Sequence, residues 1–163
     1  MWNVNADSAA RMVARLRDTG LDAVVASDLE HAVRTADIVT SATLATSPLI
    51  KGEWLQPGVH VDLIGAFTPA MRESDDAVIM RSTIFVDSYD ALHEAGDLVH
   101  PIRAGILSRE DVKGSLAELC KGGVRGRRSR DDITMFKAVG TALADLAAAS
   151  LAYKADAPEQ LRR

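Results

Sequence analysis

Two short apolar runs dominate the pattern of hydrophobic and polar positions along the chain. Residues 38–42 and 59–64 are rich in β-branched side chains and are bounded by turn-forming residues. Such runs are typical of strands that are buried on both faces of a parallel sheet. Both runs end in small residues, and the ligands of open parallel sheets bind beyond the carboxyl ends of the strands. The pattern therefore predicts a ligand site where these two strands end.

The rest of the chain alternates between strand and helix patterns. Residues 1–3 have the pattern of a strand stub, and residues 23–26 of a short strand. Helices are predicted before Gly20, over 28–35, over 69–81 from Pro69, over 88–95 up to Gly96, and over 109–121. Further strands are predicted over 83–87 and 133–138, and an alanine-rich helix over 141–154. This alternation predicts an α/β fold with a doubly wound parallel sheet.

Composition narrows the class of protein. The 163 residues are enough for one ordinary domain, and 47% of them are hydrophobic, as in globular chains. The formal net charge of −4 gives no reason to expect binding to nucleic acid or to a membrane. One cysteine allows no intrachain disulfide, and the four histidines lack the spacing of metal ligands. We expect a cytoplasmic protein without a bound metal.

Five separated blocks resemble the ornithine cyclodeaminase/mu-crystallin family in order and spacing. They are ADIVTSATLATSPLI, GEWLQPGVHVDLIGA, the P-x-x-R-E pattern of residues 69–73, VDSYDALHEAGDL and ITMFKAVGTALADLAAA. The resemblance implies a Rossmann-like domain, one half of a protein about twice this length. The expected fold is truncated, because the first strand, its glycine-rich turn and a preceding substrate domain have no counterpart here. Residues 1–140 would be a partial NAD(P)-binding domain, and residues 141–163 a helix packing toward the substrate domain.

The resemblance also implies that three loops hold NAD(P)H. The implied cofactor-binding residues are Thr43, Leu44 and Ala45, then Gly65 and Ala66 beside the nicotinamide, and Val139 and Gly140 in the loop that closes on it. A tight turn is the competing interpretation of each loop, since glycine and other small residues serve turns equally well. Their position at strand ends favours the functional interpretation.

The family often has W-N-R where this chain has Trp2-Asn3-Val4, and that arginine commonly faces the 2′-phosphate of NADP. Val4 leaves the choice between NAD and NADP open. Asn3 and Asn5 are expected either to contact the ribose or to cap the first helix, a role that asparagine serves well.

Phe67 is the residue that distinguishes branches of the family. In cyclodeaminases the matching position is an aspartate that acts on the substrate amine, and phenylalanine cannot accept a proton. The chain therefore resembles the ketimine-reductase branch, with Phe67 on the substrate side. Lys137 is assigned to the substrate side as well, with a purely structural role as the alternative. Arg72 and Glu73 are expected to be a structural pair or part of a helix surface.

These residues lead to one functional expectation and two alternatives. The chain is expected to be the carboxy-terminal part of an NAD(P)H-dependent cyclic imine reductase of amino-acid metabolism, with pyrroline-2-carboxylate as an example substrate. The partners would be a nicotinamide nucleotide, a small imino or amino acid and a second copy in a homodimer. The alternatives are an ornithine cyclodeaminase and a non-catalytic remnant. Catalytic residues are not assigned, because the resemblance puts the substrate-binding arginine and the proton-donating lysine in the other half.

Overall fold

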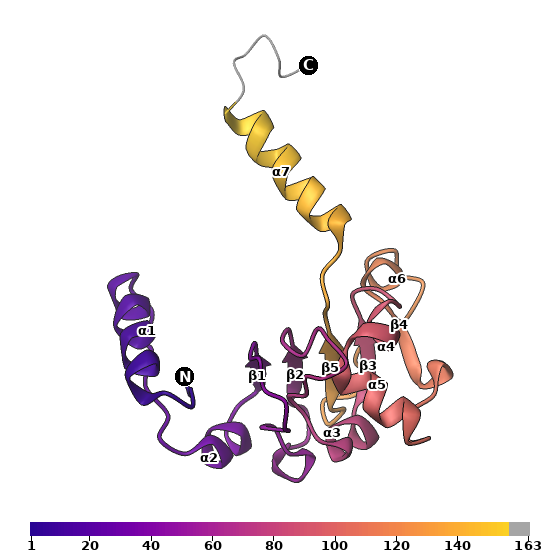
Figure 1. The fold of residues 1–163 in the computed structure, drawn as a ribbon, viewed down its shortest axis with the longest axis horizontal. Helices are drawn as coiled ribbons and strands as arrows, with labels where there is room; N and C mark the ends of the chain where they lie inside the picture. Colours follow the sequence, from indigo (N-terminus) through magenta and orange to yellow (C-terminus); the bar gives the residue numbers. More distant parts are fainter. Residues whose placement is uncertain (157–163) are drawn as a thin grey trace.

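A five-stranded parallel sheet forms the centre of the protein (Figure 1). The computed structural model describes residues 1–156. The strands are β1 (Ile38–Ser41), β2 (His60–Leu63), β3 (Thr83–Val86), β4 (Val112–Ser115) and β5 (Thr134–Lys137), in the spatial order β1-β2-β5-β3-β4. Every pairing is parallel, so all five carboxyl ends lie at one edge of the sheet. The predicted α/β, Rossmann-like parallel sheet is confirmed.

Short helices connect the strands. They are α2 (Leu29–Arg34), the 3-10 turn η1 (Gly52–Trp54), α3 (Asp76–Arg81), α4 (Ala91–Glu94), α5 (Gly96–Arg103), the 3-10 turn η2 (Arg109–Asp111) and α6 (Leu116–Cys120). Asp28 and Asp75 begin α2 and α3 by accepting backbone N–H groups from their first turns. At α6, Ser115 and Glu118 form a reciprocal capping box.

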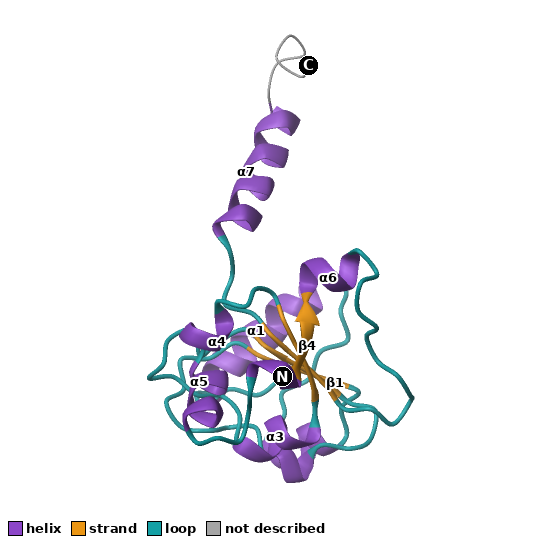
Figure 2. Ribbon diagram, turned by 90° about the vertical axis from the view of Figure 1, so that its right-hand side faces the viewer, coloured by secondary structure: helices purple, strands orange, loops and turns teal. Residues whose placement is uncertain are grey.

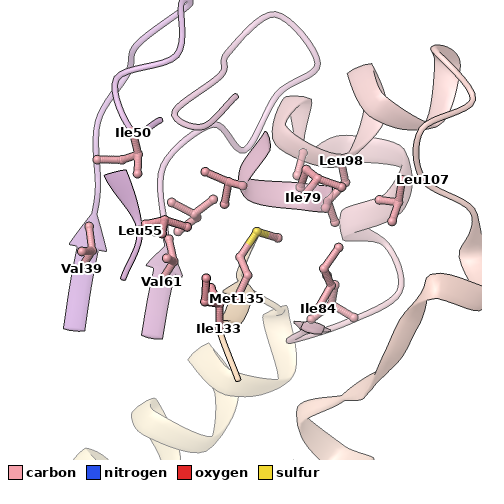
Figure 3. Close-up of a cluster of buried hydrophobic side chains, with 14 of the residues drawn as sticks. Val39, Ile50, Leu55, Val61, Ile79, Ile84, Leu98, Leu107, Ile133 and Met135 are labelled. Carbon is pink, nitrogen blue, oxygen red and sulfur yellow. The ribbon is translucent and has the colours of Figure 1, made fainter. Parts of the chain in front are cut away.

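The apolar core lies on one face of the sheet, under η1, α3, α4 and α5 (Figure 3). Val61, Leu63 and Met135 are fully buried at its centre. Burial of each such side chain stabilises the fold by roughly 1.5–3 kcal/mol. The core therefore holds the central strands, and with them the edge where their carboxyl ends meet.

The expectation that the first two strands are buried on both faces is wrong. Burial alternates along β1 and β2, so Val39 and Val61 point into the core while Ile38 stays 65% exposed. A strand shows this alternation when only one face of its sheet is covered. In residues 1–156 the helices over β1 and β2 lie on the core face; the other face is open to solvent at β1 and half-buried at β2.

The amino-terminal segment folds outside the sheet. Helix α1 (Ala6–Asp18) forms as predicted, beyond the β1 side of the sheet in Figure 1. The predicted strand at 23–26 is wrong, because these residues are irregular. Their backbone still meets the start of the chain, since the amino group of Met1 donates to the Val24 carbonyl and Ala26 N–H donates to the Met1 carbonyl. In the described residues no strand lies beside this segment to extend the pairing.

Three predicted helices are corrected by the structure. The helix expected from Pro69 begins at Asp76, and the preceding residues form a loop that enters the core. The helix predicted over 88–95 is the shorter α4, which ends before Gly96 as predicted, and Gly96 then begins α5. The helix predicted over 109–121 is in fact η2, β4 and α6 in succession. In each case tertiary packing outweighs the local pattern.

Helix α7 (Ala142–Asp156) forms where the alanine-rich segment predicted it, and it projects away from the sheet (Figures 1 and 2). Its apolar side chains are open to solvent, with Leu143 77% and Leu151 70% exposed. The prediction that residues 141–163 pack toward another domain stays a prediction, and its last seven residues lie outside the described part of the chain.

Candidate functional site

The loops after β1 and β2 meet at the carboxyl edge of the sheet. Gly65 lies against the carbonyl oxygen of Thr43, so closely that a Cβ atom on this glycine would overlap that oxygen. The same Cβ would come within 2.5 Å of a carboxylate oxygen of Glu73. The structure therefore brings together the two sequence-predicted loops, and the close approach of their backbones explains why a glycine occupies position 65.

The loop after β5 joins the same edge through hydrogen bonds to Asp87. The carboxylate of Asp87 accepts the N–H groups of Val139 at 2.9 Å and Gly140 at 2.7 Å. Ala138 donates its N–H to the Leu63 carbonyl at the end of β2. Sequence reasoning missed Asp87, although an acidic residue directly after a strand in this sheet was a usable signal.

Phe67 protrudes from the loop after β2 on a constrained backbone. Its side chain is 47% exposed, and the preceding Ala66 has a φ of +47°, a left-handed conformation that L-residues adopt at a cost. Gly96 fixes this loop to the start of α5, because its N–H donates to the carbonyls of Ala66 and Thr68, both at 3.2 Å. Leu44, on the loop after β1, is 69% exposed. The edge thus presents two apolar side chains from adjacent loops.

Asn3 and Asn5 have the capping role that was one of their two predicted uses. The Asn5 side chain accepts the Ser8 N–H at 2.9 Å and begins α1, and Asn3 accepts the Asn5 N–H at 2.8 Å. Asn3 also lines a cavity of about 410 Å³ that runs along the outer edge of β1 and reaches Thr43. A contact of either asparagine with a ribose stays a prediction.

Lys137 is fully buried beneath the edge instead of lining an open cleft. Its ammonium group donates to the Gly65 carbonyl and lies 3.4 Å from Asp97 Oδ2, which is also fully buried. The expected pairing of Arg72 with Glu73 is wrong, because Arg72 pairs with Asp76 while Glu73 has no exposed surface. Glu73 is thus neither on a helix nor on the surface.

His60, a histidine whose pKa is shifted, lies at the opposite end of β2. Burial lowers the pKa of His60, with Asp62 raising it and Arg127 lowering it by weaker charge effects. The ring nitrogen Nδ1 of His60 is 2.8 Å from the Thr134 hydroxyl. Since His60 begins β2 and the candidate site lies where β2 ends, this histidine does not belong to the site.

Two features of the described residues bear on other classes of protein. Residues 1–156 contain no group of three or more His, Cys, Asp or Glu side chains arranged to hold a metal ion. No helix among them has the length and apolar character needed to cross a membrane.

Comparison with known proteins decides the family. The sequence model of the ornithine cyclodeaminase/mu-crystallin family matches residues 1–158. The chain belongs to this family. The resemblance of the five sequence blocks is thereby confirmed.

Its relatives include proteins named as pyrroline-2-carboxylate reductases and ketimine reductases. A Delta(1)-pyrroline-2-carboxylate reductase of Paracoccus denitrificans is 45% identical over 92% of this chain and 48% of its own length. The ketimine reductase mu-crystallin of Mus musculus is 34% identical over 94% of this chain and 45% of its own.

A solved structure supports the same relationship. The Delta(1)-pyrroline-2-carboxylate reductase of Thermococcus litoralis, in complex with NADH and L-proline, superposes with a TM-score of 0.90 at 30% identity. The superposition covers 94% of this chain and 48% of that one. The chain thus spans about half the length of the relatives it matches.

Proposed function

We propose that this chain is the carboxy-terminal, nicotinamide-side part of an NAD(P)H-dependent cyclic imine reductase of amino-acid metabolism. The substrate class is cyclic α-imino acids such as pyrroline-2-carboxylate. The observation that carries the proposal is the exposed, apolar Phe67 at the carboxyl edge, in a chain that is 45% identical to a pyrroline-2-carboxylate reductase. An acidic residue at this position would favour the cyclodeaminase alternative.

The residues at the edge suit one side of a nicotinamide ring. The two loops offer apolar side chains, Leu44 and Phe67, together with small residues that allow close approach of a flat ligand. When bound, reduced nicotinamide supplies the hydride for an imine carbon, and the protein binds and orients the reactants. Leu44 and Phe67 would exclude water from the ring, and the loop of Val139 and Gly140 would close beside it.

Residues for the pyrophosphate do not stand out in the described part of the chain. A pyrophosphate is usually held by a glycine-rich turn at a helix amino terminus after a strand. The space beside Gly65 and Gly96 is occupied by backbone carbonyls and, at Gly65, by the Glu73 carboxylate, so neither glycine is open to a phosphate. We therefore assign to this chain the nicotinamide side, and assign the phosphate and substrate-carboxylate contacts to the other half of the family's length.

Three further properties belong to the same proposal. The protein would act as a homodimer in the cytoplasm, and α7 would pack toward the substrate domain. Support for a dimer comes from an archaeal alanine dehydrogenase dimer with bound NAD, similar to this chain with a TM-score of 0.88 at 30% identity. The exposed leucines of α7 support a packing role, because apolar helix faces are normally covered.

The test is an assay of the full reading frame that contains residues 1–163. The purified product is mixed with pyrroline-2-carboxylate and either NADH or NADPH, and oxidation of the reduced nicotinamide is followed by absorbance. We expect turnover with formation of proline. No oxidation with any cyclic imino acid would refute the proposal, and release of ammonia from ornithine would establish the cyclodeaminase alternative.

A further inference from the structure

Three charged side chains are fully buried together at the carboxyl edge of the sheet. Glu73, Asp97 and Lys137 each have 0% exposure, and they are the only buried Asp, Glu, Lys or Arg side chains among the described residues. A buried ion network seldom stabilises a fold more than apolar side chains of the same volume would. Stability alone therefore does not account for this cluster, and its location beneath the candidate site points to a role there.

Glu73 lies between the loop after β1 and the loop after β2. Its Oε1 atom accepts the Ser41 hydroxyl at 2.7 Å and the Thr43 N–H at 2.5 Å. The same carboxylate packs against Gly65 and occupies the space that a Cβ atom on this residue would need. One side chain thus contacts both loops that form the proposed nicotinamide-side surface.

Asp97 and Lys137 close the network into a ring. Asp97 Oδ1 accepts the backbone N–H groups of Glu73 at 2.9 Å and Ser74 at 2.8 Å, which fixes where the Glu73 side chain starts. Lys137 lies 3.4 Å from Asp97 Oδ2 and donates to the Gly65 carbonyl, which returns the network to the second loop. The links are buried except for the partly buried one from the Thr43 N–H, so water competes little for these contacts and the two loops are held together.

We propose that Glu73 is the positioning residue that couples the loop of residues 43–46 to the loop of residues 65–68. The ligand identity in this inference rests on the proposed function, whereas the coupling itself does not. Glu73 acts through backbone groups and touches no ligand, since it has no exposed surface. Its effect on a nicotinamide ring would come from holding Thr43 and Gly65 at a fixed separation.

Hydrogen exchange tests the coupling without any ligand. The Glu73→Ala variant should lose amide protection in 43–46 and 65–68 together, while segments in β3 and β4 keep theirs. The Glu73→Gln variant keeps an oxygen that accepts both hydrogen bonds and should protect both loops nearly as well as the wild type. Glu94→Ala, a glutamate exposed on α4, is the matched control and should change neither loop. Ser41→Ala is a second variant for the case that Glu73→Ala does not fold. It removes one hydrogen bond to Glu73 with little loss of volume, and it should loosen both loops partly.

Four results would overturn the inference, and the first three concern which segments lose protection. These three are unchanged protection of both loops in Glu73→Ala and Ser41→Ala, loosening of one loop alone, and an equal loss of protection in every segment. Equal loosening in Glu73→Gln and Glu73→Ala would also overturn it, because glutamine keeps the hydrogen bonds from Ser41 and Thr43 and the packing against Gly65.

Kinetics of the full reading frame extend the test to function. In Glu73→Ala, kcat per folded active site should fall roughly 10- to 100-fold, the effect of a misplacement near 1 Å, with a smaller fall in Glu73→Gln. A structural role alone would lower the fraction of folded enzyme and leave kcat per folded site unchanged, which would overturn the functional part. If the wild type neither binds nicotinamide nor reduces imines, the proposed function fails while hydrogen exchange still decides the coupling.

Discussion

Replacing Lys137 with methionine should destabilise the protein strongly. Methionine fills much of the same volume but removes the charge that lies 3.4 Å from Asp97 Oδ2, an oxygen with no hydrogen-bond partner. Both side chains are fully buried, so solvent cannot compensate the remaining carboxylate. Breaking a buried pair from one side typically costs about 3–5 kcal/mol. A domain has only about 5–15 kcal/mol of net stability, so the loss is a large fraction of the total.

Urea denaturation followed by circular dichroism measures this change in the free energy of unfolding. Lys113→Met is the matched control, because Lys113 is exposed on strand β4 and its replacement should change stability by less than about 0.5 kcal/mol. Adding Asp97→Asn to Lys137→Met removes the unpaired charge and should cost less than the sum of the single changes. A loss below about 1 kcal/mol for Lys137→Met would refute the reasoning that the pair is a buried ion pair.

Four further predictions follow from the structure. Gly65→Ala should lower the free energy of unfolding by about 1–3 kcal/mol through overpacking against Thr43 and Glu73. Gly123→Ala is the control and should cost little, because the nearest atom to its added Cβ would be 3.6 Å away. Equal losses of stability in thermal unfolding would contradict this. Burial lowers the pKa of His60, so the folded state favours its neutral form. The stability of the wild type should therefore fall as the pH drops below about 6.5, the ordinary pKa of histidine. The stability of His60→Gln should fall less over the same pH range. An equal pH dependence in both proteins would be the contrary result. Phe67→Asp in residues 1–163 should give no ornithine turnover, and detectable ammonia release would overturn that expectation. Residues 1–163 alone should associate through the outer edge of β1 and bind NADH weakly in calorimetry, so a monodisperse monomer with micromolar affinity would contradict both statements.

Four of the five strands were predictable because each has a local signal. The apolar positions of β1, β2, β3 and β5 are mostly β-branched or aromatic, Leu63 and Met135 being the exceptions, and the strands are bounded by turn residues. The strand β4 has no such signal, because Val-Lys-Gly-Ser contains one apolar side chain. It forms through its partner β3, and Gly114 in it leaves room for the Val124 side chain, which a Cβ atom would approach to 2.7 Å. Tertiary contacts of this kind leave no trace in a local pattern.

The sequence located the candidate site by position and missed the groups that hold it. Parallel strands must end at one edge, so Thr43, Gly65 and Val139 could be placed near one another from strand ends alone. The hydroxyl of Ser41 that meets the carboxylate of Glu73 lies 32 residues away in the chain. A glutamate beside an arginine in a polar segment gives no local sign of burial, and a surface position is the usual outcome for it.

The division between predicted and missed residues has a physical basis at this edge. The loops carry small residues because backbones approach closely there, and that requirement acts on each loop separately. Their relative placement depends on carboxylates from other elements, namely Glu73 for the loops after β1 and β2 and Asp87 for the loop after β5. Glu73 is fully buried and Asp87 is half-buried, and each accepts backbone N–H groups from loop residues, which offsets the cost of removing a carboxylate from water. Glu73 and Asp87 therefore determine how the loops meet, while the exposed side chains of the loops determine what they can contact.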